Sequence, residues 1–252
     1  MENRRQMILD KLEDNGSVRV NELSRELNCS AVTIRTDIRE LEKAGKLTRV
    51  HGGAVRLEKE GSVKDKIPVL RLHVEQKKKI AEKAYEYINN QDMIILDDSS
   101  TCYYLGCYIR DHSEKNVTIV TNSLLTAYEL AGIPHVNLNI VGGHVSGTLS
   151  ATVGNMTLET LEHAHVNKAF IGAHGVNLEI GLTSIGSSQM EIKKAIIKAA
   201  DEVTVLADSS KFGGGYLSVV CPLTDISRII TDDGINEEQV KCAKELGVNL
   251  VC

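Results

Sequence analysis

Five short polar segments of the sequence follow apolar runs, and the first of them is the most distinctive. Residues 94–101 read IILDDSST, so a buried strand would end directly in two carboxylates, two serines and a threonine. Hydroxyl groups, together with the free N–H groups at the start of a following helix, form a common binding site for a phosphate group. The segment therefore predicts an anion site. It leaves open whether a protein with such a site transforms a phosphorylated metabolite or senses it.

The other polar segments follow further predicted strands, and ligands of parallel α/β sheets lie beyond the carboxyl ends of the strands. Several polar strand ends along one edge therefore predict a single ligand site. Two lysines are candidate counter-charges for an anion there, although each is also typical of an ordinary surface lysine. The candidate residues are Asp97, Ser99, Ser100, Thr101, Thr121, Asn122, Ser123, Gly142, Gly143, His174, Glu191, Lys194 and Lys211.

The elements that must position these residues alternate along the chain. Strands are predicted at 93–96, 117–120, 138–141, 168–171, 203–206, 228–230 and 248–251. Helices are predicted at about 74–88, 102–110, 189–200 and 237–246, with a further one ending near 130. This alternation predicts an α/β domain with a mostly parallel sheet that is covered on both faces. The first of these helices carries Lys77-Lys78-Lys79, and we expect most of these lysines on its solvated face.

Composition excludes several classes of protein. The chain has 252 residues, of which 42% are hydrophobic and 25% charged, a balance typical of globular domains. Its six cysteines include no CxxC pair, and its polar start and short apolar runs predict a cytoplasmic protein without a membrane span. No Walker loop, GxGxxG or GxSxG motif is present, and His163-Ala164-His165 lacks partners at metal-binding spacing. We therefore expect neither a cofactor nor a metal.

The first 57 residues predict three short helices and a hairpin. The first helix covers residues 4–15, and the third covers residues 31–44 after an N-cap at Ser30. The second helix ends at Asn28, a residue that tolerates the left-handed conformation of a C-cap. Two short helices joined in this way form a helix-turn-helix. This segment carries 11 lysines and arginines against 9 acidic residues, whereas the remainder carries 18 against 25, which favours a nucleic-acid module on an acidic body.

The third helix has one apolar and one exposed face. Ile34, Ile38 and Leu41 form its buried stripe. The opposite face suits the major groove of DNA, because arginine can fork onto guanine and threonine reaches phosphates or base edges. A plain solvated face is the competing interpretation, since the helix also carries acidic residues. The candidate DNA-binding residues of this region are Ser30, Val32, Thr33, Arg35, Thr36 and Arg39.

A predicted hairpin follows this helix. Residues 47–50 and 54–57 are strand-like and are joined through His51-Gly52-Gly53. A helix-turn-helix followed by a hairpin is a winged helix, whose wing lies along the DNA backbone. Arg49, His51, Gly52 and Gly53 are therefore further candidate DNA-binding residues, although His51 is equally typical of a turn without DNA contact.

Residues 17–54, SVRVNELSRELNCSAVTIRTDIRELEKAGKLTRVHGGA, closely resemble the N-terminal signature of the DeoR/GlpR family of bacterial transcriptional regulators. Family members often carry two basic residues after the Thr-Ile pair, where this chain has Arg35 and Thr36, so the resemblance implies DNA binding but does not identify the operator sequence. The later strings LDDSST, VTNS, VGG, KAFIGAHGV, EIKKAII and LADSSKFG resemble the effector domain of the same family in order. The family more often has glycine at the position of Ser99.

This resemblance implies a fold related to ribose-5-phosphate isomerases and CoA transferases, used to bind sugar phosphates or related metabolites. We expect a winged helix-turn-helix domain at 1–57, a linker at 58–75 and an effector-binding domain at 76–252. The expected function is that of a repressor of a carbohydrate-utilisation operon, which binds double-stranded operator DNA as a homo-oligomer (dimer or tetramer) and is released by a phosphorylated sugar.

The alternative function is a sugar-phosphate isomerase-like enzyme that carries a DNA-binding arm. Such an enzyme needs a carboxylate base beside the substrate carbon. The related isomerases place aspartates in the loop after the strand equivalent to 168–171, where this chain has Gly172-Ala173-His174-Gly175. Other carboxylates remain available, so this departure favours a sensor without excluding catalysis.

Overall fold

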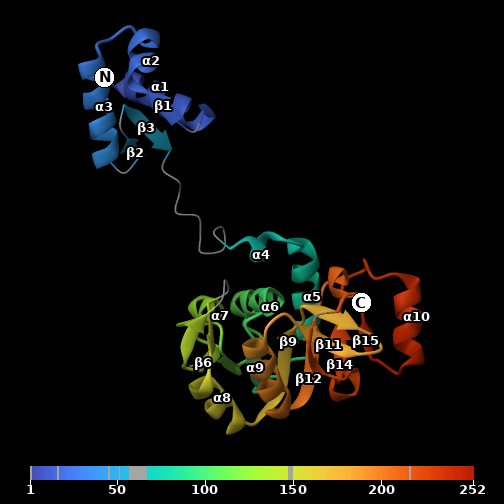
Figure 1. Cartoon of the computed structure of the whole chain (residues 1–252). Coiled ribbons are helices and arrows are strands. Elements are labelled where there is room, and N and C mark those ends of the chain that lie inside the picture. The colour runs from blue at the N-terminus through green and yellow to red at the C-terminus, as the bar shows by residue number, and fades with distance from the viewer. Residues whose placement is uncertain are drawn as a thin grey trace. The chain divides into compact units, whose positions relative to one another are not determined.

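The computed structural model describes residues 2–15, 17–44, 46–50, 52–56, 67–146, 150–215 and 217–252. The chain divides into two compact units, Met1–Lys66 and Ile67–Cys252, which we call the head and the effector unit (Figure 1). Each unit has its own hydrophobic core, and each is described by itself.

The head has the predicted order of elements, with one additional strand. Helices α1 (Glu2–Asn15), α2 (Val20–Glu26) and α3 (Ala31–Lys43) precede strands β2 (Leu47–Val50) and β3 (Gly53–Arg56). The turn between α2 and α3 contains Asn28 at a φ of 48°, the left-handed conformation that its sequence predicts. The additional strand, β1 (Ser17–Arg19), pairs antiparallel with β3, so the hairpin becomes a three-stranded sheet.

The core of the head contains the predicted apolar stripes. Ile34, Ile38 and Leu41 of α3 are buried together with Ile8 and other residues of α1 and α2. One acidic residue of α3 is buried with them, because Asp37 accepts hydrogen bonds from Arg4 (2.6 Å) and Arg5 (3.1 Å) of α1. Burial opposes ionisation of Asp37, but these two guanidinium groups hold the pKa of its carboxyl below the ordinary value. The ion pairs therefore fix α3 against α1 and leave the opposite face of α3 to solvent.

The effector unit is built on a seven-stranded parallel sheet in the order β15-β14-β12-β9-β4-β5-β6. Every one of these strands was predicted. Their bounds are β4 (Met93–Leu96), β5 (Val117–Thr121), β6 (Val136–Ile140), β9 (Val166–Gly172), β12 (Ala200–Leu206), β14 (Arg228–Ile230) and β15 (Leu250–Val251). Thus the mixed α/β class with a mostly parallel sheet is confirmed.

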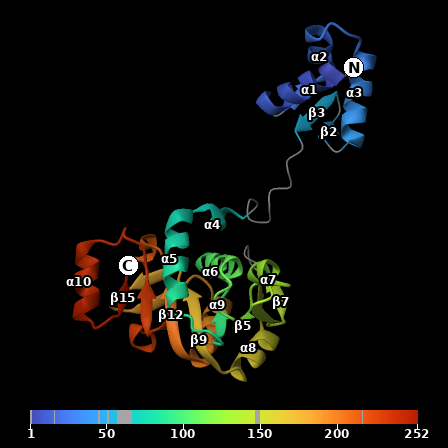
Figure 2. The same cartoon turned by 180° about the vertical axis from the view of Figure 1, so that it is seen from behind.

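Helices cover both faces of this sheet (Figures 1 and 2). In β4, Ile94 and Leu96 belong to one hydrophobic core and Ile95 to the other, as the alternation of side chains along a strand requires. The first core contains residues of α5 (Val74–Glu86), α6 (Ser100–Asp111) and α7 (Leu124–Leu130), and the second contains residues of α8 (Asn155–Glu162) and α9 (Ser187–Lys198). Helix α10 (Glu237–Glu245) contacts β15 near the end of the chain.

Several short elements were not predicted. Strands β10 (Gly175–Asn177), β11 (Gly181–Ser184) and β13 (Ser218–Cys221) form an antiparallel sheet, and β7 (His144–Ser146) pairs with β8 (Ala151–Val153). Single helical turns occur at Ser209–Lys211 and Leu223–Asp225. Among the described residues, no helix combines the length and hydrophobicity of a membrane span.

The end of the predicted linker belongs to the effector unit. Residues 67–75 form α4 (Pro68–Arg71) and the start of α5, and both Ile67 and Leu70 are buried in the first core. Residues 58–66, the remainder of the predicted linker, lie outside the described residues. The sequence between 67 and 75 shows no periodicity because a helix of four residues is too short to display one.

Candidate DNA-binding surface and effector pocket

The exposed face of α3 carries the predicted DNA-binding side chains. Val32, Arg35, Thr36 and Arg39 are exposed, with 69% of Val32 accessible to solvent. Ser30 caps the helix by accepting a hydrogen bond from the Thr33 N–H at 3.1 Å, and its hydroxyl also pairs with that of Thr33 at 2.8 Å. The cap satisfies one of the free N–H groups at the helix start, so α3 begins as an ordered turn.

The hairpin places its glycines differently from the prediction. Gly52 is exposed with a φ of 84°, as a tight turn requires, and its carbonyl accepts from Val20 N at 2.9 Å. Gly53 is buried, and an added Cβ would lie 2.0 Å from the Val18 oxygen. Its lack of a side chain therefore allows β3 to approach β1. Arg49 is exposed, whereas the predicted contact at His51 lies outside the described residues.

The loop after β4 adopts the predicted strand-to-helix geometry. Ser99 caps α6 by accepting a hydrogen bond from the Cys102 N–H at 3.1 Å, and α6 begins at Ser100, two residues earlier than predicted. Ser99 also lies close to the end of β9, because a Cβ added to Gly172 would lie 2.3 Å from the Ser99 Cβ. The ends of the neighbouring strands β4 and β9 therefore meet at the start of α6.

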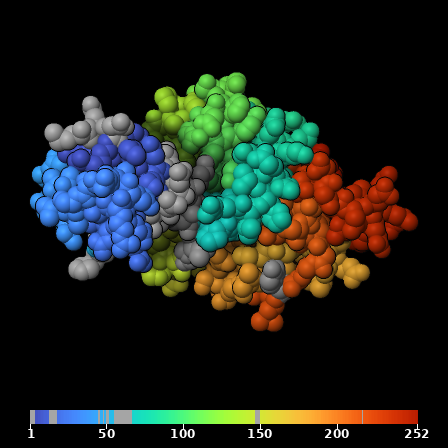
Figure 3. Space-filling model, turned by 90° about the horizontal axis from the view of Figure 1, so that it is seen from above, coloured from blue at the N-terminus to red at the C-terminus, as the bar shows by residue number. Residues whose placement is uncertain are grey.

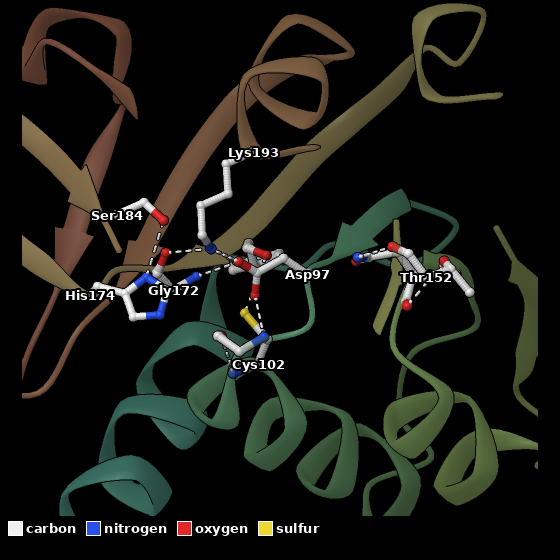
Figure 4. A network of polar contacts seen from close by, with 10 residues as sticks. Asp97, Cys102, Thr152, Gly172, His174, Ser184 and Lys193 are labelled. Atoms are coloured by element: carbon white, nitrogen blue, oxygen red, sulfur yellow. Dashed lines mark hydrogen bonds and ion pairs between the residues drawn. The ribbon is translucent and has the colours of Figure 1, made fainter. Parts of the chain in front are cut away.

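Asp97 connects these strand ends below the loop (Figure 4). Its side chain is fully buried and accepts hydrogen bonds at 2.9 Å from both Ser99 N and Gly172 N. It also forms an ion pair with Lys193 of α9, whose ammonium donates to the Gly172 carbonyl at 2.8 Å. Burial opposes both charges, yet the pair lowers the pKa of Asp97 and raises that of Lys193. Both groups are therefore ionised at neutral pH.

Asp98, the second carboxylate of the loop, has the opposite electrostatic environment. It is 7% exposed, and burial together with the neighbouring Asp97 charge raises its pKa. Lys193 and the Asn122 amide offset only part of this shift. A carboxyl group with a raised pKa takes up a proton more readily, so Asp98 can serve as a hydrogen-bond donor as well as an acceptor.

A pocket opens above Asp97 and Lys193, at the carboxyl edge of the sheet. Eight residues of the polar segments at the ends of β4, β9 and β12 meet here, and residues from α4, α9 and β12 complete the walls. His174 contacts Ser184 at 3.3 Å, and its pKa is lowered by burial and by Lys193, so the ring is neutral at pH 7. The lining residues are Val69, Asp98, Ser99, Ser100, Thr101, Gly172, Ala173, His174, Gln189, Lys193, Leu206 and Lys211.

Other predicted effector residues lie beside the pocket and do not line it. Ser123 caps α7, Thr121 accepts from Ser123 N at 3.1 Å, and the Asn122 amide donates to the Thr152 carbonyl at 3.2 Å. The Gly142 carbonyl accepts from Thr157 at 2.9 Å, and Gly143 has a φ of 149°. These residues shape the neighbouring strand ends. Asn122 approaches the pocket through Asp98 alone.

Glu191 and Lys194 lie on the outer face of α9, away from the pocket, where they line a separate groove beside α8. The lysine that reaches the pocket is their neighbour Lys193, which the sequence analysis did not select. The spacing of residues along the helix identifies Lys193 from the sequence. Residue 193 follows Gln189 by four positions and precedes the buried Ile196 by three, so these three residues share one face of α9.

Two family models match the sequence. The DeoR-like helix-turn-helix domain matches residues 4–60, and the DeoR C terminal sensor domain matches residues 72–233. The chain belongs to the DeoR family of transcriptional regulators. The resemblance seen in the sequence strings is thereby confirmed, and this DeoR-family protein is a DNA-binding transcriptional regulator.

Relatives of this DeoR-family chain match over nearly its whole length. It is 34% identical to the uncharacterized HTH-type transcriptional regulator YulB of Bacillus subtilis, across 98% of this chain and 95% of the relative. It is 32% identical to the lactose phosphotransferase system repressor of Staphylococcus epidermidis, across 90% of each chain. Among solved structures, ribose 5-phosphate isomerase from Plasmodium falciparum aligns with 54% of this chain and 52% of its own, at 20% identity and a TM-score of 0.40.

Proposed function

We propose that this protein represses a carbohydrate-utilisation operon and releases its operator when a phosphorylated sugar occupies the pocket. The observation that carries the proposal is the convergence of Ser99, Ser100 and Thr101 with Lys193 and Lys211 around one pocket. The start of α6 supplies free N–H groups and a positive dipole end, which together favour an anion. The relatives support the same class of function, since one of them is a repressor named for lactose.

The rest of the pocket suits the sugar portion of such an effector. Asp98 and His174 are polar groups that can pair with hydroxyls, and a carboxyl of raised pKa can either donate or accept. Val69 and Leu206 supply apolar walls. Few convergent polar groups against apolar walls are typical of small-ligand sites.

The head binds the operator through the exposed face of α3 in this proposal. A single helix-turn-helix reads only a few base pairs, so we propose that the protein binds paired half-sites as a symmetric oligomer. Arg35 and Arg39 are the residues that contact bases or phosphates, and Arg49 of the hairpin contacts the backbone. Both arginines of α3 are exposed.

The pocket favours sensing over catalysis. Asp97 is occupied by Lys193 and by two backbone N–H groups, so it is not available as a base for a sugar carbon. The loop after β9 reads Gly172-Ala173-His174-Gly175 and has no carboxylate, whereas the isomerase-like alternative needs one there. We therefore propose that the protein binds a sugar phosphate without converting it.

The test uses the full-length protein and a DNA duplex selected by it from a random-sequence pool. A panel of phosphopentoses and phosphohexoses is screened for an increase in melting temperature, because a ligand of the native state must stabilise it. At least one compound should raise the melting temperature, release the DNA and emerge unchanged. If no phosphosugar stabilises the protein, the effector class is wrong. If the compound is isomerised at an enzymatic rate, the isomerase alternative holds.

A further inference from the structure

One wall of the pocket comes from a short helix at the start of the effector unit. Helix α4 begins directly after the residues that join the two units, and its Val69 lines the pocket opposite the loop of Ser99–Thr101. In Figure 3, α4 and α5 lie between α6 and the C-terminal strands and helix, on the surface of the effector unit. The same four-residue helix therefore touches both the pocket and the start of the connection to the head.

Two side chains hold the backbone of α4 in place. The Tyr104 hydroxyl donates to the Leu70 carbonyl at 2.8 Å, and the Lys77 ammonium donates to the Val69 carbonyl at 2.6 Å. Ile67 and Leu70 add buried apolar contacts. Because α4 contributes so few residues, these contacts determine where Val69 lies.

Lys77 is only 2% exposed, which is unusual for a lysine. Burial lowers its pKa to about 8, while Asp208 raises it and Lys211 lowers it further. Lys77 therefore senses the charge of the turn at Asp208–Lys211, and Lys211 itself lines the pocket. An anion beside Lys211 would offset the repulsion between the two lysines and stabilise the Lys77 ammonium, the form that makes the stronger hydrogen bond to the Val69 carbonyl.

The joint between α4 and α5 is strained. His73, which precedes α5, has a φ of 52°, in the left-handed region that is sterically unfavourable for a residue other than glycine. Leu72 beside it is 57% exposed. Helix α4 is therefore not a rigid extension of α5, and its position depends on the contacts of Val69 and Leu70.

We infer that α4 is a strap that reports the occupancy of the pocket to the connection with the head. An anionic effector packs against Val69 and strengthens the hold of Lys77 on the Val69 carbonyl, and both effects fix α4. Lys77 is a positioning residue, since it contacts the strap and not the effector. The inference rests on the proposed function, because it needs an anionic ligand in this pocket.

The test is trypsin cleavage after Arg71 in the full-length protein, followed by mass spectrometry, because Arg71 and Leu72 are exposed. Inorganic phosphate and ribose 5-phosphate are the probes, and the melting temperature reports their binding separately. The variants are Lys77→Met, which keeps the bulk of the side chain but removes its donor, and Val69→Ala, which shortens the wall. Lys78→Met is the matched control, because Lys78 is exposed, forms its ion pair with Glu75 of the same helix and, among the described residues, donates no hydrogen bond to α4.

In the wild type and in Lys78→Met, a probe that raises the melting temperature should slow cleavage after Arg71 by about five-fold or more, the lower end of typical coupling between sites. In Lys77→Met and Val69→Ala the probe should still stabilise the protein but should protect Arg71 less. Stabilisation of the wild type without protection at Arg71, or equal protection in all four proteins, would overturn the strap.

A failure of the proposed function gives a different result. If neither probe raises the melting temperature, the proposed effector class is wrong. The strap is then tested by the rates at which trypsin cleaves the unliganded proteins after Arg71. Lys77→Met should then be cleaved after Arg71 faster than the wild type and Lys78→Met. Equal rates in the three unliganded proteins would overturn the inference.

Discussion

Asp97 and Lys193 form a buried ion pair, and Lys193 also lines the pocket. The sequence indicates Asp97 as a site residue because it follows a strand. It indicates Lys194, and not Lys193, as a counter-charge. The two lysines are adjacent in the sequence but about 100° apart around the helix, so a count of charges cannot separate them. The lysine that faces inward is identified by its spacing on α9. Lys193 shares one helix face with Gln189, which lines the pocket, and with the buried Ile196.

Substituting Asp97 by Asn should destabilise the effector unit by about 3–5 kcal/mol, because it leaves the buried Lys193 ammonium without its partner. Asp98→Asn is the control. Burial and the Asp97 charge disfavour the charged form of Asp98, so the loss of that charge should cost less than the loss of the Asp97 charge. Urea unfolding followed by tyrosine fluorescence measures the effector unit alone, since all seven tyrosines lie beyond the head. Equal losses in the two variants would contradict the assignment.

Lys77 predicts a pH dependence of defined sign. Its pKa is about 8 in the folded protein, against 10.5 for an ordinary lysine, so the unfolded chain binds more protons between these values. The free energy of unfolding of the wild type should therefore rise, relative to that of Lys77→Met, as the pH increases from 8 towards 10.5. Asp208 and Lys211 are the charged groups that set this pKa. Urea unfolding followed by circular dichroism checks it, and a difference that is constant over this pH range would contradict the burial of the charge.

At the scale of elements, the parallel strands were predicted well because they alternate with helices along the chain, and the helix-turn-helix because its helices carry apolar stripes. Strands such as β4 and β14 were placed with the bounds that the structure has. The strands β10, β11 and β13 have three or four residues, like β4 and β14, but were missed, because they pair antiparallel in a separate sheet, outside the alternation of strands and helices. Strand β1 was missed too, and with it the structural role of Gly53.

Helix α3 allows stability and DNA recognition to be separated. Ser30→Ala removes the N-cap and should cost about 1 kcal/mol, seen as faster hydrogen exchange of the α3 amides. Arg35→Ala and Arg39→Ala should leave this exchange unchanged, because both side chains are exposed. A base-reading arginine should cost about 1–3 kcal/mol of sequence discrimination, whereas a phosphate contact should reduce the salt slope by about one unit. If both arginine variants bind the selected DNA like the wild type, α3 does not enter the groove.

At the scale of the whole molecule, the DNA-binding head and the pocket belong to separate units of the chain. The predicted linker extends to residue 75, whereas the effector unit begins at Ile67, because α4 has no readable pattern and is held by tertiary contacts. A ligand can change DNA binding only if it binds the two functional states of the protein with different affinity. In the proposed function, this difference arises from the ligand bound in the pocket.

Ser100 is the residue at which this claim can be tested without disturbing the head. It is 9% exposed, lines the pocket and is the first residue of α6. Ser100→Asp sets a negative charge against a phosphate at that position. Ser113→Asp makes the same change in charge at an exposed position just beyond the other end of α6 and serves as the control.

The most direct measurement is the release of selected operator DNA from the full-length protein as a stabilising phosphosugar is added, with melting curves to confirm folding. One lost hydroxyl contact to a charged phosphate is worth about 1.5–3 kcal/mol, or roughly ten- to a hundred-fold in affinity, and the added charge increases the loss. Ser100→Asp should therefore bind DNA like the wild type but require at least about ten-fold more phosphosugar for release, while Ser113→Asp responds normally. A folded Ser100→Asp protein that releases DNA at the wild-type phosphosugar concentration would contradict the account.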